Sequence, residues 1–344
     1  MLRDRESQMS SDDEFRRSAQ EVRTHFFLPP SGYHFCSAPD ETCLRLDAIV
    51  DSVLRDYREV AEAFRHSLKS TLSTVAMPVA LAHASAQQRH FQKFRAVAAI
   101  QALLIEPDAI KPGEDLEAAR DREGEESARK EMHEFAKSKE GTDAIALDIC
   151  RFLLDGIRNG QLESAAKELL QQGTILLWSA FEVLFRDVFE IHMNLNPSKA
   201  EVLAQHTSTR KRFGVERFSL DTLVKHGFDL SSQVGTVLVS QHDLADLPTV
   251  KTVYTLLFPA SGDLLERLND PDLWLFYQRR HLLVHRRGIV DQTYLDNTSD
   301  NVPINAHLPL KPKDFENYYS VVRSAGEALL SCLTVASGHS ERAS

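Results

Sequence analysis

The 344-residue sequence contains no apolar run close to the roughly 18 residues that a membrane-spanning helix needs. The most apolar segment, residues 71–86, is rich in alanine and is interrupted by Pro78 and His83. The first residues are charged and lack the apolar core of a secretory signal. We therefore expect a soluble, cytoplasmic protein with no membrane partner.

Cysteine is also scarce, because the chain has only Cys36, Cys43, Cys150 and Cys332. Six residues separate Cys36 from Cys43, and this spacing is not that of a zinc knuckle. The pattern favours ordinary thiols in a reducing compartment.

The sequence has no P-loop, no G-x-G-x-x-G fingerprint, no G-x-S-x-G elbow and no C-x-x-C pair. These absences remove the sequence support for a nucleoside triphosphatase, a dinucleotide enzyme, a serine hydrolase and a thioredoxin-like protein. We expect neither a cofactor nor a resident metal ion.

The net charge of −10 argues against a protein that coats nucleic acid non-specifically, because such binding depends on neutralising phosphates. Positive charge nevertheless gathers at residues 279–287 and 210–217, whereas residues 106–140 hold much of the acidity. If a polyanion binds, we expect it at the two basic segments. The alternative for residues 210–217 is a solvated basic turn.

Apolar residues recur at helical spacing in several segments, most clearly at 44–66, 174–193, 270–288 and after Pro312. Asp270 and Pro271 are typical of a helix start, and Gly288 is typical of a helix end. Residues 289–295 and 301–310 are expected to be extended. Strands and helices do not alternate, so the sequence predicts an all-α helical bundle.

A highly charged stretch at residues 106–140 divides the chain. It has almost no large apolar residues and is either a solvated helix or a linker. We place the domain boundary within it. A mostly helical region is thus expected at residues 1–140 and a helical domain at 141–344.

The segment RRHLLVHRR, residues 279–287, places an arginine among apolar residues. At about 100° per residue, Arg280 falls within an arc formed by Leu273, Phe276, Tyr277, Leu283 and Val284. A guanidinium cannot be neutralised, so this position requires partners for its donors or an anion. His281 and His285 lie one turn apart on the flank of the arc, but without the glutamate of a metal-binding H-E-x-x-H motif.

The segment from Leu273 to Leu295 resembles the R-x4-6-H motif region of HEPN domains, which are α-helical modules. Arg280, His281 and His285 match the motif, and Gly288 with the apolar tail behind it matches the usual continuation. Residues 178–192 resemble the first long helix of the module and residues 315–333 its closing helix. The resemblance covers about residues 145–335. A second match to the spacing, Arg186 to His192, lacks the glycine and the tail.

The resemblance implies a metal-independent endoribonuclease that acts as a homodimer, with the motifs of two protomers facing one cleft. Arg280 would hold the scissile phosphate, His285 would serve as acid or base, and His281 would orient the phosphate or His285. Arg279, Arg286 and Arg287 would contact the RNA. Arg280 and His285 are about 140° apart on a straight helix, so their convergence requires a second protomer or unwinding near Gly288.

Glu182 lies against an apolar face of residues 174–193 and is a candidate partner for Arg280. Such a pair would either orient Arg280 for function or be purely structural.

Many proteins of this kind are toxins or antiviral effectors, and the resemblance implies such a role here. The alternative is a non-catalytic HEPN-like scaffold that binds a nucleotide, an RNA or a protein. A third interpretation is an adaptor in which Arg280 only braces helices. Residues 1–140 are expected to bind a regulatory protein partner.

Overall fold

The computed structural model of the protein describes residues 15–28, 41–104, 115–214, 220–242 and 244–334. Every regular element within these residues is a helix, and β-pairing is limited to the isolated bridges Val53–Thr334 and Ile289–His307. The prediction of an all-α fold is therefore confirmed. No helix in this part of the chain has both the length and the apolar character that crossing a bilayer demands. Cys36 and Arg217 of the predicted basic segment 210–217 lie outside the described residues.

The chain forms two compact units, and their division differs from the boundary expected within residues 106–140. Unit 1 comprises Met1–Ala38 and Val75–Glu168, and unit 2 comprises Pro39–Thr74 and Leu169–Ser344. The segment Pro39–Thr74 therefore belongs with the C-terminal half of the chain. It is held there by long-range contacts, such as the hydrogen bond of 2.9 Å from Leu54 N to Leu333 O. Periodicity within one segment carries no information about such contacts.

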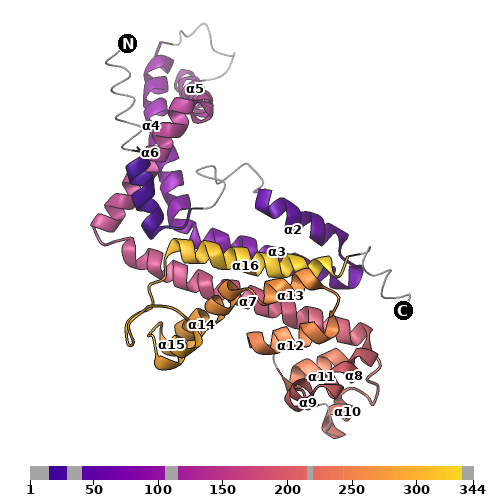
Figure 1. Ribbon diagram of the computed structural model, residues 1–344. Coiled ribbons are helices and arrows are strands. Elements are labelled where there is room, and N and C mark those ends of the chain that lie inside the picture. Colours follow the sequence, from indigo (N-terminus) through magenta and orange to yellow (C-terminus); the bar gives the residue numbers. More distant parts are fainter. Residues whose placement is uncertain (1–14, 29–40, 105–114, 215–219, 243, 335–344) are drawn as a thin grey trace. The chain divides into compact units, whose positions relative to one another are not determined.

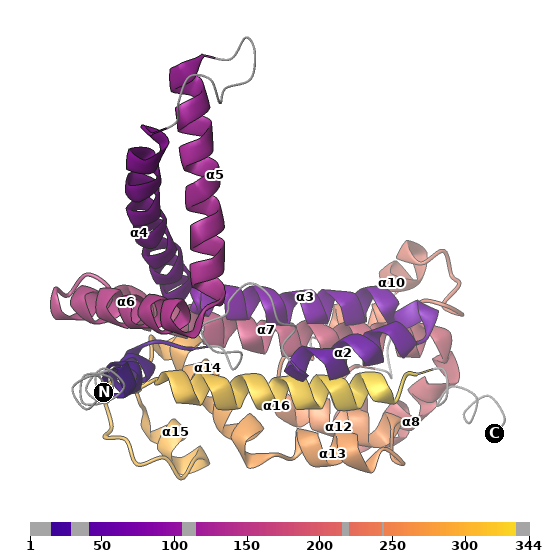
Figure 2. The ribbon, with the colours of Figure 1, turned by 90° about the horizontal axis from the view of Figure 1, so that it is seen from above.

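In unit 1 the charged stretch forms a helix rather than a linker. This helix, α5 (Leu116–Lys137), begins after Asp115, whose carboxylate accepts hydrogen bonds from two backbone N–H groups of the first turn. It packs along α4 (Met77–Ala102), and α6 (Lys139–Arg158) follows after the N-cap Ser138. Figure 2 shows α4 and α5 side by side, extending away from α6.

The contact between α4 and α5 is made by small side chains. Ala98 and Ala102 on α4 are buried, as are Ala119 and Ala128 on α5. A Cβ atom at Gly124 would lie only 3.6 Å from Ala98 O. Close approach of the two backbones thus compensates for the lack of large apolar residues in this stretch.

Unit 2 is a bundle in which α3 (Arg58–Val75), α7 (Glu163–Leu195) and α16 (Pro312–Ser331) run side by side in Figures 1 and 2. The predicted helix at 44–66 is interrupted after α2 (Glu41–Ser52), where Val53 forms its bridge to Thr334. Other helices of this unit include α9 (Thr207–Arg212), α10 (Leu220–Lys225), α12 (Leu247–Leu257), α13 (Gly262–Leu268), α14 (Pro271–Arg286) and α15 (Gln292–Asn297).

Helix α14 carries the RRHLLVHRR segment. The carboxylate of Asp270 caps its start by accepting from Asp272 N at 2.8 Å, and it ends where Arg287 and Gly288 adopt φ angles of 55° and 75°. The predicted start and end of this helix are confirmed. The expected extended conformation at 289–295 is wrong in its second half, because Asp291 caps α15 by accepting from Tyr294 N.

Replacing Gly326 on α16 tests the packing of α3, α7 and α16. An added Cβ would lie 2.3 Å from Phe64 Cε1 and 3.2 Å from Leu184 Cδ2, so these side chains would have to move. We expect Gly326→Ala to lower the free energy of unfolding, measured in urea, by about 1–3 kcal/mol. At the control position Gly262 an added Cβ meets nothing within 4 Å, so Gly262→Ala should be neutral or slightly stabilising. Equal losses in both variants would contradict this packing.

Candidate functional site

Arg279, the first arginine of the motif, is buried in unit 2 with 8% of its surface exposed. Its Nη2 donates to Asp300 Oδ2 at 2.6 Å, and its Nη1 donates to Tyr318 Oη at 2.8 Å. Its Nε lies 3.2 Å from Tyr294 Oη, and Asp314 Oδ1 lies 3.5 Å from Nη1. Tyr294 also donates to Asp300. We call these five side chains the Arg279 network.

The groups of this network stabilise one another electrostatically. Burial opposes the charge of Arg279, but Tyr318, Asp300 and Tyr294 outweigh it and raise the pKa of the guanidinium. Burial, followed by the hydrogen bond to Asp300, raises the pKa of Tyr294 to about 12. The pKa of Asp300 is lowered although burial acts against it, because Tyr294 and Arg279 donate to its carboxylate. The network is therefore a satisfied, charged cluster inside the unit.

The sequence assigned RNA contact to Arg279, and its position in the structure is incompatible with that role. All of its donor groups point toward Tyr294, Asp300, Tyr318 and Asp314, and its side chain is only 9% exposed. The burial of Arg279 depends on polar partners on α15, in the segment that follows it and on α16. The periodicity of α14 contains no information about these partners.

Arg280 has a different environment. It forms an ion pair with Glu182 on α7 at 3.4 Å, and each of the two side chains is 19% exposed. The pairing that the sequence suggested is therefore present. The Nε atom of Arg280 is buried and has no hydrogen-bond partner within the described part of the chain. Arg280 thus keeps donor capacity that its protein partner does not use.

The exposed face of α14 brings Tyr277, Arg280, His281, Val284 and His285 into one stripe. These positions follow one another at intervals of three, one, three and one residues, which place them on the same side of a helix. The rings of His281 and His285 are exposed, and their centroids are 4.6 Å apart. Because α14 remains helical through Arg286, unwinding does not bring His285 toward Arg280.

The two histidines differ in their surroundings. Burial lowers the pKa of His281, and the positive charges of His285 and Arg280 lower it further, while Asp291 acts in the opposite direction. His281 is therefore favoured in its neutral form, which can accept a proton or a hydrogen bond.

Arg286 and Arg287 lie at the C-terminal end of this face. Both are exposed, and Arg286 Nε is 3.2 Å from Asp291 Oδ2. Arg287 adopts the left-handed conformation that ends the helix. Unlike Arg279, both side chains are placed where an external anion can reach them.

Aromatic and charged side chains border the stripe on its N-terminal side. The ring of Tyr277 packs against Trp178 at 5.2 Å and against Trp274 at 5.6 Å. Lys251 lies over the Trp274 ring at 5.7 Å from its centroid. No cluster of three or more metal-ligating His, Cys, Asp or Glu side chains is present among the residues that the structure describes.

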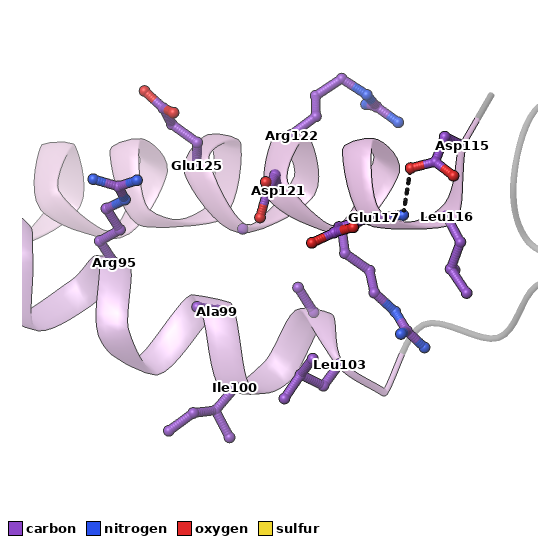
Figure 3. A pocket seen from close by; sticks show the side chains of 13 residues that line it. Arg95, Ala99, Ile100, Leu103, Asp115, Leu116, Glu117, Asp121, Arg122 and Glu125 are labelled. Atoms are coloured by element: carbon purple, nitrogen blue, oxygen red, sulfur yellow. Dashed lines mark hydrogen bonds between the residues drawn. The ribbon is translucent and has the colours of Figure 1, made fainter.

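A cavity of about 790 Å³ lies far from these residues in the sequence, at the end of the α4–α5 hairpin of unit 1 (Figure 3). Arg95 and apolar side chains of α4 line it together with charged side chains of α5, without a histidine, cysteine, serine or threonine. Its carboxylates are not accompanied by a histidine, the side chain whose ordinary pKa lies nearest to neutral pH. The candidate functional site is therefore the exposed face of α14.

No protein-family model, no curated protein and no solved structure matches this chain. The functional argument consequently rests on the residues of the α14 face and on their geometry.

The second match to the motif spacing, Arg186 to His192, has a structural role at its histidine. His192 Nδ1 is 3.1 Å from Tyr57 Oη in the core, and the ring packs on Phe258 at 4.8 Å. Burial, with a smaller contribution from Lys199, lowers the pKa of His192 to about 4. Arg186 is engaged by its neighbour Asp187 at 2.8 Å.

The buried His192 should make stability depend on pH. Its pKa falls from 6.5 in the unfolded chain to about 4 in the folded one, so between these values the unfolded chain binds more protons. Its contribution is therefore complete above pH 6.5 and is lost as the pH falls toward 4. We expect the free energy of unfolding to drop by about 2 kcal/mol between pH 7 and pH 5 from this group.

Urea titrations of the wild type, His192→Gln and His206→Gln at a series of pH values measure this contribution. His192→Gln should flatten the pH dependence, whereas His206→Gln, at an exposed position, should leave it unchanged. The same slope in the wild type and His192→Gln would show that His192 does not titrate as its burial requires.

Proposed function

We propose that the protein is a metal-independent endoribonuclease of the HEPN type, with its site on the exposed face of α14. The observation that carries this proposal is the division of roles between two adjacent arginines. Arg279 takes the structural role inside unit 2, whereas Arg280 pairs with Glu182, is partly exposed and lies beside two exposed histidines. An arginine and a histidine pair on an open surface suit the recognition and cleavage of a phosphodiester.

The cleavage follows from the chemistry of these groups. The 2′-hydroxyl of a ribose attacks the adjacent phosphorus, and the bond to the 5′-oxygen breaks. One group must remove the 2′-proton, a second must protonate the leaving 5′-oxygen, and a cation must stabilise the phosphorane. In the dimer described below, His285 of one protomer removes the 2′-proton and His285 of the other protonates the leaving 5′-oxygen, while Arg280 holds the phosphate and the neutral His281 orients the phosphate or His285. The products carry a 2′,3′-cyclic phosphate and a 5′-hydroxyl.

Glu182 orients Arg280 in this mechanism. A single ion pair of 3.4 Å fixes the direction of the guanidinium without occupying all of its donors. Arg286 and Arg287, at the end of the same helix, contact the neighbouring phosphates of the RNA.

A homodimer brings Arg280 and His285 together from two copies of α14, because on a single helix these two side chains point apart. The two helices that carry the Glu182–Arg280 pair also expose apolar side chains: Leu176 and Val183 on α7 are 46% and 39% exposed, and Val284 on α14 is 42% exposed. This mixture of apolar and charged residues can be self-complementary in a two-fold interface. Two copies of α14 would then bring two sets of Arg280, His281 and His285 to one cleft.

The biological role that follows is that of a toxin or antiviral effector, and a regulatory protein partner would bind unit 1. The distal end of the α4–α5 hairpin supports this second point, because Ile100 on α4 and Leu104 just after it are 68% and 81% exposed. Figure 3 shows Ile100 pointing away from α5. We assign this face to a helix of the regulatory protein and not to the homodimer contact.

Cleavage of RNA in the presence of EDTA tests the proposed activity. We expect the wild type to produce 2′,3′-cyclic phosphate ends, and Arg280→Ala and His285→Ala to lower kcat by about 100-fold or more while folded. Arg267→Ala and His206→Ala, at other surface positions of unit 2, are the matched controls and should cleave normally. Equal cleavage by all five proteins would refute the site. RNA binding without turnover in the wild type would identify the non-catalytic scaffold instead.

Light scattering coupled to size-exclusion chromatography tests the dimer face. The double variant Val183→Glu, Val284→Glu should elute with the mass of one chain and lose cleavage, because two carboxylates would be buried without partners. Ile100→Glu on α4 should keep the mass of the dimer. Dissociation by Ile100→Glu would overturn the assignments of both faces, and an unchanged mass in the double variant would place the dimer contact elsewhere.

A further inference from the structure

The Arg279 network lies on the side of α14 opposite to the exposed stripe. His281 follows Arg279 by two residues, or about 200° around the helix, so the two side chains leave α14 in nearly opposite directions. The partners of Arg279 come from α15, from the segment that follows it and from α16. Any rotation of α14 about its axis would therefore break hydrogen bonds at Arg279.

Apolar packing alone would fix the rotation of α14 about its axis less precisely than the hydrogen bonds of Arg279 do. Leu273, Phe276, Leu282 and Leu283 are buried on α14, but the free energy of burying them depends little on direction. Hydrogen bonds to a planar guanidinium depend strongly on distance and angle. Tyr318 combines both kinds of contact, since its ring stacks on Phe276 at 4.5 Å and its hydroxyl accepts from Arg279.

A second connection fixes the other end of the motif. Arg286 pairs with Asp291 at 3.2 Å, and Asp291 caps α15 by accepting from Tyr294 N at 2.9 Å. The same Tyr294 reaches Arg279 through its hydroxyl. Helix α15 and its N-cap Asp291 therefore contact α14 on both sides of residues Arg280 to His285: Tyr294 contacts Arg279 before them, and Asp291 contacts Arg286 after them.

We propose that Arg279 is a positioning residue: through Asp300, Tyr294 and Tyr318 it sets the rotation of α14 and thereby the placement of Arg280, His281 and His285. It does not touch the substrate. The inference rests on the proposed function for its activity measurement only, because the placement of the histidines can be measured without RNA.

The full-length protein with Tyr318→Phe is the sharpest test, because it removes one hydroxyl and keeps the ring on Phe276. Asp300→Asn removes the negative charge that pairs with Arg279. Arg279→Lys keeps the positive charge but replaces the planar guanidinium with an ammonium group. Tyr319→Phe makes the same chemical change one residue along α16, outside the network, and is the matched control. All variants are studied well below their melting temperatures, as followed by circular dichroism.

The first measurement is the titration of the imidazole NMR signals of His281 and His285. A less firmly held α14 gives His281 more access to water, so its lowered pKa should rise toward the ordinary value in Tyr318→Phe. Tyr319→Phe should titrate like the wild type. A His281 titration that is unchanged in every folded network variant would overturn the positioning role and leave Arg279 as a structural brace.

The second measurement separates kcat from KM in RNA cleavage. Displacing reacting groups without touching the substrate should lower kcat about tenfold in Tyr318→Phe and more in Arg279→Lys, with KM changed less than about twofold. A rise in KM at constant kcat would contradict the proposal. If the wild type cleaves no RNA, the ribonuclease assignment fails, and the histidine titrations still decide whether Arg279 positions the α14 face.

Discussion

The burial of one permanent positive charge organises the part of unit 2 that carries the site. Arg279 cannot lose its proton, so its interior position requires a carboxylate and enough acceptors to replace water. Asp300 provides the carboxylate, and Tyr294 and Tyr318 provide hydroxyl groups. Satisfying this guanidinium brings α15, the segment after it and α16 to the same side of α14. The opposite side of α14 is left exposed.

Arg280 is the next residue along α14, and its side chain leaves the helix about 100° away from that of Arg279. In this different environment the same residue type has a different role. It meets one carboxylate, Glu182, and retains an Nε atom without a partner. The exposed His281 and His285 lie on the same stripe. A site that binds a phosphodiester needs this combination of an oriented but incompletely satisfied cation and groups that exchange protons near neutral pH. The structural role of Arg279 and the proposed phosphate-binding role of Arg280 thus belong to neighbouring residues of one helix.

Unit 1 is held together in a different way. Its α4–α5 hairpin packs through alanine and glycine, so large apolar side chains such as Ile100 and Leu104 are not needed for the internal contact and remain exposed. The charged residues of α5 lie on the outside, with i,i+4 pairs such as Glu125–Arg129 at 2.7 Å. The hairpin is therefore stabilised by close backbone packing and by surface ion pairs rather than by a large apolar core.

The sequence by itself determined the all-α fold and the start and end of α14, because capping residues and helical spacing act within a few residues of one another. Tertiary structure decided which arginine is buried: the periodicity favoured Arg280, but the partners of Arg279 lie on α15 and α16. It also made α5 a packed helix and joined residues 39–74 to the C-terminal half. These outcomes depend on contacts between residues that are distant in the chain, and local sequence patterns do not indicate such contacts.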